Sequence, residues 1–191
     1  MHRALRAVVV AALGCVPLFI ASHAFADVTI IGNGLAADCS ASARAASHQA
    51  RYVDALRACD LALENEPLST HETAATYVNR GVLYLANRNY EEAKRDFDAA
   101  SRVEPVLGEA YVNRGAALIG EGRDADGIAD IDRGLSLNTS EPEKAYYNRA
   151  LAEERQNDLK GAYTDYQKAL EIKPGWATAQ TELARFHVSQ R

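Results

Sequence analysis

The sequence predicts an all-α protein in which a pair of helices repeats along the chain. The segment YVNRG at residues 77–81 recurs as YVNRG at 111–115 and as YYNRA at 146–150, at offsets of 34 and 35 residues. Small, aromatic and proline residues recur at matched places between these segments. Self-similarity at this period indicates a solenoid whose units bury their apolar faces against one another.

The composition is that of a folded soluble protein. The chain has 191 residues, of which 48% are hydrophobic and 25% charged. These fractions argue against a disordered, collagen-like or polytopic membrane protein. The net charge is −5, and residues 1–26 contain two arginines and no acid, so the remainder carries −7. Because an acidic surface repels a phosphate backbone, we predict no nucleic-acid partner.

The first 26 residues have the layout of a secretory signal peptide. A basic start, MHRALR, precedes an apolar run at 7–21, and Ala24-Phe25-Ala26 places small residues at −3 and −1 before Asp27. The apolar run contains glycine and proline and is shorter than the roughly 20 residues of a membrane-spanning helix. We expect cleavage after Ala26 and a periplasmic or secreted protein. The alternative is a retained N-terminal anchor, with membrane contact only through the uncleaved signal.

The repeats resemble the tetratricopeptide repeat, whose 34-residue pattern runs Trp or Tyr, Leu-Gly, Tyr, Ala, Phe and Pro. In the best unit these places hold Tyr77, Gly81, Tyr84, Ala93, Phe97 and Pro105. Arg80 stands where the family has Leu. The resemblance covers residues 36–190 and implies a right-handed superhelical solenoid of helix-turn-helix units.

This pattern places each element in chain order. A divergent first repeat lacks the Tyr-x-Asn-Arg motif, three fuller repeats follow, and an amphipathic C-terminal stretch predicts the capping helix that covers the last apolar face of a solenoid. The predicted boundaries are 1–26 for the signal peptide, 27–35 for an extended lead-in, 36–69, 74–107, 108–141 and 143–176 for the four repeats, and 177–191 for the capping helix.

The third repeat departs most from the pattern. Gly127 and Gly134 stand where the other fuller repeats have alanine. Each glycine inside a helix costs up to about 1 kcal/mol relative to alanine. We therefore expect this repeat to be the least stable, through slack packing or as a hinge.

Two rows of polar residues recur with the repeat. Each arginine of the motif precedes an aspartate by sixteen residues, in the pairs Arg80 and Asp96, Arg114 and Asp130, and Arg149 and Asp165. The divergent repeat lacks both charges, so the two are present or absent together. We interpret them as structural ion pairs that join the two helices of a repeat, with an anion-binding ladder as the alternative.

The second row is Asn79, Asn113 and Asn148, each one residue before the arginine. Asparagine is a poor residue for a helix interior, so its recurrence there asks for a reason. In family members that bind extended peptides, the matching asparagine lies on the concave face, and its carboxamide can both donate to and accept from a peptide backbone. The alternative is that the asparagines bond within the stack.

The predicted groove around the asparagine row is mainly apolar. Its lining is formed by Val78, Val82, Val112, Ala116, Tyr147 and Leu151. Such a groove suits an extended segment with hydrophobic anchors. The family's carboxylate clamp needs lysines beside the asparagines, and Val78 and Val112 stand at those places. We therefore do not predict recognition of a terminal carboxylate of the EEVD type.

The divergent repeat contains the two cysteines that remain after signal cleavage. The alignment places Cys39 on the first helix and Cys59 on the second, at the places of Tyr77 and Phe97. These places face each other within a helical hairpin, so a disulfide is a reasonable prediction for an exported chain. Two buried thiols are the alternative.

No motif predicts catalysis or a cofactor. The segment GNGLAA at residues 32–37 matches a dinucleotide fingerprint by its letters, but the fingerprint needs a βαβ unit and the chain continues into helical repeats. The histidines lack partners at ligand spacing, so no metal site is predicted.

The repeat pattern and the signal together predict function. We expect a non-enzymatic protein-protein interaction scaffold or adaptor of the bacterial envelope that binds an extended polypeptide segment of another protein and needs no cofactor. One alternative is a self-associating structural module, a homo-oligomer. The other is a nucleotide-dependent enzyme that acts through residues 32–37.

Overall fold

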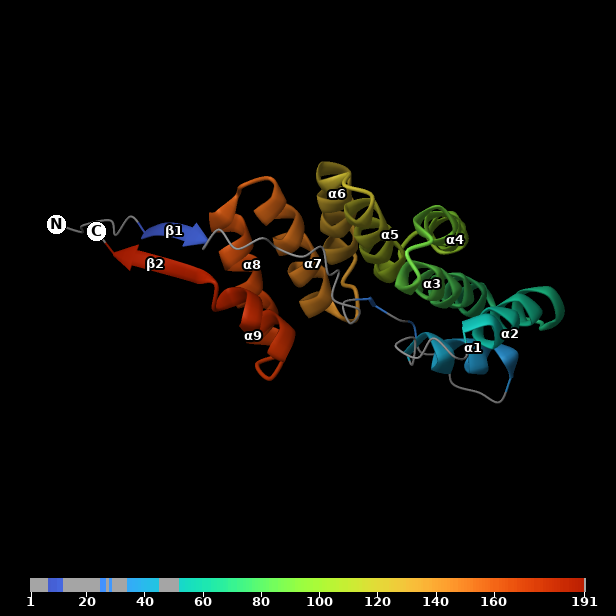
Figure 1. Cartoon of the computed structure of the whole chain (residues 1–191). Helices are drawn as coiled ribbons and strands as arrows, with labels where there is room; N and C mark the ends of the chain where they lie inside the picture. Colours follow the sequence, from blue (N-terminus) through green and yellow to red (C-terminus); the bar gives the residue numbers. More distant parts are fainter. Residues whose placement is uncertain (1–6, 12–24, 27, 29–33, 45–51, 191) are drawn as a thin grey trace. The chain divides into compact units, whose positions relative to one another are not determined.

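The computed structural model describes residues 7–11, 25, 26, 28, 34–44 and 52–190 (Figure 1). The chain divides into two compact units, one of residues 25–141 and one of residues 1–24 with 142–191. Most of the described residues are α-helical. The predicted all-α helical-repeat fold is therefore confirmed.

The first unit consists of three antiparallel helix pairs. The helices are α1 (Leu35–Arg44), α2 (Tyr52–Asn65), α3 (Thr70–Ala86), α4 (Tyr90–Val103), α5 (Gly108–Gly120) and α6 (Asp124–Ser136). They correspond to the first three predicted repeats, two helices to a repeat, although α1 begins one residue before the predicted start at 36 and α3 begins four residues before the predicted start at 74. The predicted lead-in at 27–35 lies outside the described residues except for Val28, Gly34 and Leu35.

The second unit contains a fourth helix pair, a short helix and two strands. They are α7 (Pro142–Arg155), α8 (Leu159–Ile172), α9 (Ala177–Leu183), β1 (Ala7–Ala11) and β2 (Phe186–Gln190), with β1 and β2 antiparallel. The capping helix expected over 177–191 is thus only seven residues long. Beyond it Phe186 is buried against the rings of Tyr163 and Tyr166, at centroid distances of 5.9 and 5.8 Å. This contact and the strand pairing replace further helix.

The turns that end the helices share one backbone conformation. The first helix of each fuller repeat ends at a residue with positive φ: Arg88 at 61°, Gly122 at 82° and Asn157 at 63°. The next N–H in the chain donates to the last helical turn, which is a Schellman arrangement. α6 ends in the same way, with Thr139 N–H donating to Gly134 O at 3.3 Å. The other repeats have proline at the place of Thr139, which lacks this donor.

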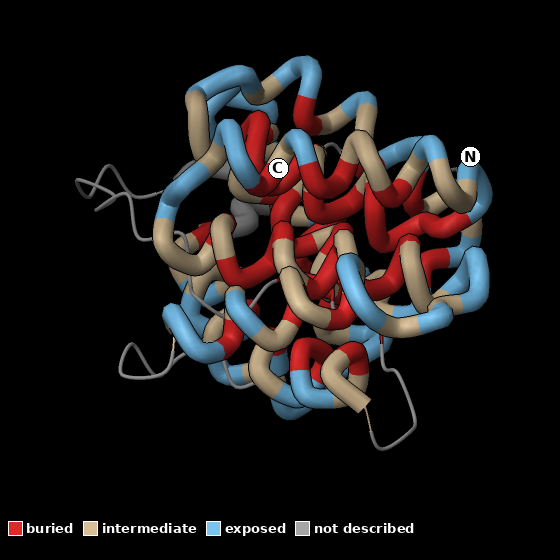
Figure 2. Tube along the Cα trace, turned by 90° about the vertical axis from the view of Figure 1, so that its right-hand side faces the viewer, coloured by how far each residue is buried: buried red, intermediate tan, exposed pale blue. Residues whose placement is uncertain are grey.

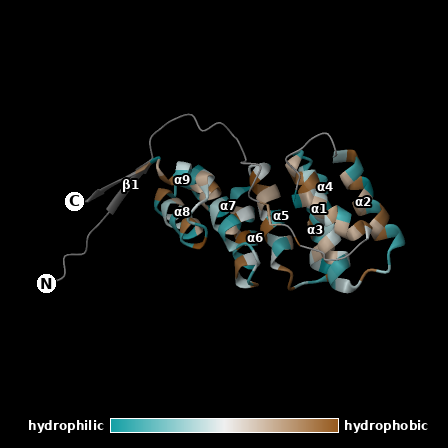
Figure 3. Cartoon of the chain, turned by 90° about the horizontal axis from the view of Figure 1, so that it is seen from below, coloured by the Kyte–Doolittle hydropathy of each residue, from teal (hydrophilic) through white to brown (hydrophobic). Residues whose placement is uncertain are grey.

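The core is formed by one side of each helix. Figure 2 shows buried residues recurring along the helices with exposed residues between them, and Figure 3 shows hydrophobic and hydrophilic residues mixed along every helix. The contacts within a hairpin are close: a Cβ added at Gly81 would lie 2.5 Å from Cε1 of Phe97. Glycine at this place therefore makes room for the aromatic ring of the facing helix.

The third repeat is packed more closely than its glycines suggest. A Cβ at Gly127 would lie 2.7 Å from Gly115 O, and one at Gly134 would lie 2.7 Å from Gly108 O. Because backbone atoms of α5 occupy this space, the two glycines are required where the helix backbones meet. The expectation of slack packing in this repeat is wrong.

The sulfur atoms of Cys39 and Cys59 lie at bonding distance and join α1 to α2. Both residues are fully buried in a cluster with Ala55 and Leu83. Within the described part of the chain, no helix has the length and apolar character that crossing a bilayer would require.

Candidate peptide-binding site

Two buried asparagines hold a segment of this chain by its backbone. Val28 N–H donates to Oδ1 of Asn79 at 3.1 Å, and Nδ2 of Asn79 donates to Val28 O at 2.8 Å. Two residues earlier, Ala26 N–H donates to Oδ1 of Asn113 at 3.0 Å, and Nδ2 of Asn113 donates to Ala26 O. Each carboxamide thus satisfies both backbone groups of one residue.

This pairing matches an extended chain. In a strand, the N–H and C=O of one residue point to the same side, and the groups two residues away point there again. Asn79 on α3 and Asn113 on α5 occupy the same place in successive repeats. The repeat spacing therefore places one carboxamide at every second residue of the segment.

The first helix pair completes this site. Ser40 Oγ donates to Val28 O at 3.0 Å, so that this carbonyl accepts two hydrogen bonds. Arg44 Nη1 donates to Ser40 Oγ at 2.7 Å. Ser40, Asn79 and Asn113 have no exposed surface. These three residues are called the asparagine site below.

The described residues of the bound segment are buried. Ala26 is fully buried, and Phe25 and Val28 are each 8% exposed. Phe25 and Ala26 lie outside the predicted lead-in at 27–35, because the sequence assigns them to the signal peptide. The asparagines were found from the sequence, but their occupant was not.

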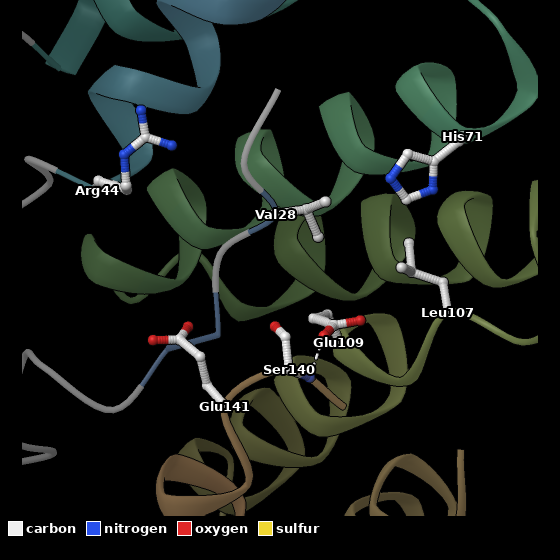
Figure 4. Close-up of a pocket in the computed structure, with 7 residues that line it drawn as sticks. All are labelled: Val28, Arg44, His71, Leu107, Glu109, Ser140 and Glu141. Atoms are coloured by element: carbon white, nitrogen blue, oxygen red, sulfur yellow. Dashed lines mark hydrogen bonds between the residues drawn. The ribbon is translucent and has the colours of Figure 1, made fainter. Parts of the chain in front are cut away.

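A pocket of about 540 Å³ opens beside Val28 (Figure 4). It is lined by Val28, Arg44, His71, Leu107, Glu109, Ser140 and Glu141. Glu109 accepts from the Ser140 N–H at 2.6 Å, and His71 Nδ1 lies 2.8 Å from Oε2 of Glu104. Basic and acidic side chains both line this pocket, so it does not select a ligand of one charge.

The predicted groove residues divide between the two units. Val78, Val82, Val112 and Ala116 are buried in the unit that holds the asparagine site. Val112 contacts α6, since a Cβ at Gly134 would lie 2.5 Å from its Cγ2. It therefore contributes to packing within the hairpin rather than to an open lining.

Asn148, Tyr147 and Leu151 belong to α7 in the second unit. Asn148 is 3% exposed. The ring of Tyr147 packs against the rings of Tyr166 and Trp176, at 5.6 and 4.9 Å between centroids. Burial raises the pKa of the Tyr147 hydroxyl above its ordinary range. Tyr147 is thus part of the core of its unit, and the peptide contact of Asn148 stays a prediction.

The structure brings together each predicted arginine–aspartate pair. The guanidinium of Arg80 donates to both oxygens of Asp96 at 2.8 and 2.6 Å, and that of Arg114 donates to both oxygens of Asp130 at 2.6 and 2.8 Å. In the second unit, Arg149 contacts Asp165 in the same way at 2.6 and 2.9 Å. These bonds join the two helices of a repeat.

A second aspartate on Arg80 and on Arg114 was missed by sequence reasoning. Nη1 of Arg80 donates to Asp60 at 2.7 Å, and Nη1 of Arg114 donates to Asp98 at 2.7 Å. Each of these aspartates comes from the preceding repeat. The signal was present, since Asp60 and Asp98 both follow the buried Cys or Phe of the second helix. All three guanidinium nitrogens of these arginines donate to carboxylates, which argues against an anion-binding ladder. Hydrogen bonding to Asp96 raises the pKa of Arg80 above its ordinary value.

The nucleotide fingerprint is occupied by a side chain. The N–H groups of Leu35 and Ala36, which begin α1, donate to the carboxylate of Glu66 at 2.7 and 3.0 Å. A bound pyrophosphate would need the same N-terminal donors. Gly34 lies outside a strand, and Gly32 lies outside the described residues. Among the residues that the structure describes, no cluster of His, Cys, Asp or Glu could hold a metal ion.

The fold and the asparagine site together define a helical-repeat protein whose paired helices hold an extended backbone. Residues 74–106 and 143–175 each match the tetratricopeptide repeat family. These matches coincide with the second and fourth predicted repeats. The chain is a tetratricopeptide-repeat protein.

Known proteins share parts of this chain. Over 95 residues it is 30% identical to the DnaJ homolog subfamily C member 7 homolog of Dictyostelium discoideum, a match that covers 48% of this chain and 17% of that protein. The chain thus spans about a sixth of the length of this curated relative.

Solved structures show the same architecture. The first tetratricopeptide-repeat domain of Spaghetti (RPAP3), bound to the HSP90 peptide SRMEEVD, is 25% identical, with a TM-score of 0.57 over 60% of this chain and 93% of that one. PilW, a type IV pilus biogenesis factor, is 23% identical, with a TM-score of 0.67 over 81% of this chain and 69% of that one.

Proposed function

We propose that this chain is a non-enzymatic interaction scaffold that binds an extended segment of another polypeptide through Asn79 and Asn113. The observation that carries this proposal is the bonding of two carboxamides to both backbone groups of residues 26 and 28. A site that contacts only backbone at these points accepts many sequences while fixing the register of the segment.

Support also comes from the domain of Spaghetti (RPAP3), which is similar to this chain and binds the HSP90 peptide SRMEEVD. We expect a different mode of recognition here, because Val78 and Val112 stand where the carboxylate clamp needs lysines. A peptide ligand of this chain should therefore bind equally well with a free or an amidated C-terminus.

The proposed setting is the bacterial envelope, after export and cleavage of the signal at Ala26. The layout of residues 1–26 and the pairing of Cys39 with Cys59 support this setting, since disulfides persist in oxidising compartments. We propose that the protein acts there as an assembly factor or adaptor.

The test is a capture experiment from envelope extract of the source organism. Wild-type protein is compared with the triple variant Asn79→Ala, Asn113→Ala, Asn148→Ala, and both must first show equal helical circular dichroism. The matched control is Asn65→Ala, since the exposed Asn65 on α2 bonds only to its own helix, at Leu61 O.

We expect a partner that wild type and Asn65→Ala capture and that the triple variant loses. Equal capture by all three would place the interface elsewhere and reduce the asparagines to packing residues. Light scattering of the eluted protein separates a foreign partner from self-association, the alternative function.

A further inference from the structure

The segment 25–28 has the properties of a ligand rather than of a linker. Both backbone groups of Ala26 and of Val28 are bonded to side chains of the asparagine site. Its three described residues are at most 8% exposed. The backbone of a linker on the protein surface would form its hydrogen bonds with water, as surface loops do.

The side chains of the segment are as constrained as its backbone. Ala26 has no exposed surface while its backbone lies against Asn113, so a larger side chain would meet protein atoms on every side. Val28 and Phe25 are nearly buried, which favours a β-branched residue and an aromatic residue at those places. The site therefore selects by side chain as well as by backbone.

We infer that residues 25–28 are a built-in competitor for the asparagine site, and that their pattern describes the foreign segment the site selects. That pattern is an aromatic residue, a small residue directly after it, and a β-branched residue two places after the small one. The inference rests on the proposed function and adds its specificity: Asn113 takes the small residue and Asn79 takes the β-branched one. A foreign segment binds by displacing the chain's own.

The proposed export step would change this competition. Cleavage after Ala26 removes Phe25 and Ala26 and leaves Val28. The bonds to Asn113 would be lost, while those to Asn79 would remain available to the chain. The precursor is then the closed form, and the processed chain presents an open place at Asn113.

The strength of the competition follows from the short covalent connection between the competing segment and the site. Only residues 29–34 separate Val28 from the start of α1. A competitor on such a short linker has an effective concentration on the order of 1 mM. Against a probe with a dissociation constant of about 10 to 100 μM, it weakens apparent binding roughly 10- to 100-fold.

The test uses the full chain and a fluorescent peptide with the sequence of residues 22–30, SHAFADVTI, blocked at both ends. The variant Ala26→Glu expels the chain's own segment, because a long charged side chain does not fit where Ala26 is fully buried. Ala26→Gly is the matched control, since it keeps the segment small. A second peptide carries the same glutamate.

We expect Ala26→Glu to bind the probe at least 10-fold more tightly than wild type and Ala26→Gly to bind it no more than a few-fold more tightly. The glutamate peptide should bind none of them. Adding Asn113→Ala to Ala26→Glu should remove probe binding. Hydrogen exchange of the unmutated chain gives an independent measurement, in which the amides of Ala26 and Val28 should be protected.

Equal probe affinity of wild type and Ala26→Glu, with unprotected amides, would overturn the built-in competitor. Probe binding that survives Asn113→Ala would place the peptide at another site and overturn the inference. A third result separates the two proposals, namely that Ala26→Glu binds no probe but still captures an envelope partner through the asparagines. The inferred pattern would then be wrong, while the proposed function would stand.

Discussion

Replacing Gly127 by alanine is expected to destabilise the protein, although helix propensity alone predicts the opposite. An alanine in a helix interior is favoured over glycine by about 1 kcal/mol. In the structure, however, the new Cβ would lie 2.5 Å from Cγ1 of Ile119 and 2.7 Å from Gly115 O. The first contact involves a side chain, but the second involves the backbone of α5.

The magnitude follows from these two terms. Overpacking a closely packed contact costs typically 1–3 kcal/mol. Subtracting the gain in propensity leaves a net loss of up to about 2 kcal/mol in the free energy of unfolding. In a double-mutant cycle, Ile119→Ala removes Cγ1 and so relieves the side-chain contact only, and the loss caused by Gly127→Ala should be smaller in that background than in wild type.

Urea unfolding followed by circular dichroism measures this change. The matched control is Gly175→Ala, because a Cβ at Gly175 has no neighbour within 4 Å. It should leave stability unchanged or raise it by about 0.4–1 kcal/mol. If Gly127→Ala has a higher midpoint than wild type at an unchanged m-value, by the amount that helix propensity alone predicts, the close approach of α5 and α6 is refuted.

Three further predictions concern covalent, ionic and titrating contacts. Replacing Cys39 and Cys59 by alanine should lower stability by about 3 kcal/mol for a loop of 20 residues, and thiol titration of the denatured wild type should find neither cysteine free. Asp96→Ala should lower the free energy of unfolding by roughly 3–5 kcal/mol, because the Asp96 side chain is only 7% exposed. Asp60 binds the same arginine but its side chain is 47% exposed, so Asp60→Ala should lower the free energy of unfolding by about 0–1 kcal/mol. Comparable losses for the two variants would contradict this difference between a buried and an exposed ion pair. Burial raises the pKa of Tyr166 far above its ordinary value near 10, so the folded state keeps the proton that the unfolded state loses. The contribution of the protonated Tyr166 to folding stability is present below about pH 10 and is lost as the pH rises above it. The tyrosinate absorbance of Tyr166 should therefore appear together with the loss of helix rather than before it.

The repeat period in the sequence predicted much of the fold. Because each unit buries its apolar face against its neighbour, the same places must hold small and aromatic residues in every repeat. That recurrence predicted the helix pairs and the family directly from the sequence. It also aligned Arg80 with Asp96 and Cys39 with Cys59, since both pairs lie within one hairpin and local geometry relates them.

Contacts between repeats were harder to predict than those within one. Asp60 bonds to Arg80 across two repeats. The sequence separation is 20 residues for Asp60 and Arg80 and 16 residues for Asp98 and Arg114. Because the two pairs do not share one spacing, the contact cannot be recognised from a constant interval in the sequence. The sequence also could not distinguish a costly glycine from a required one, because that depends on how near the backbone of α5 comes to Gly127.

The sequence by itself determined that this protein is a stack of helix pairs with asparagines at matched places. Only the tertiary structure decided what those asparagines hold. Ala26 and Asn113 are 87 residues apart, and the sequence assigns Ala26 to an address signal rather than to a fold. Their pairing depends on the depth and spacing of a site built from three helices, which is a property of the folded chain and of no local pattern.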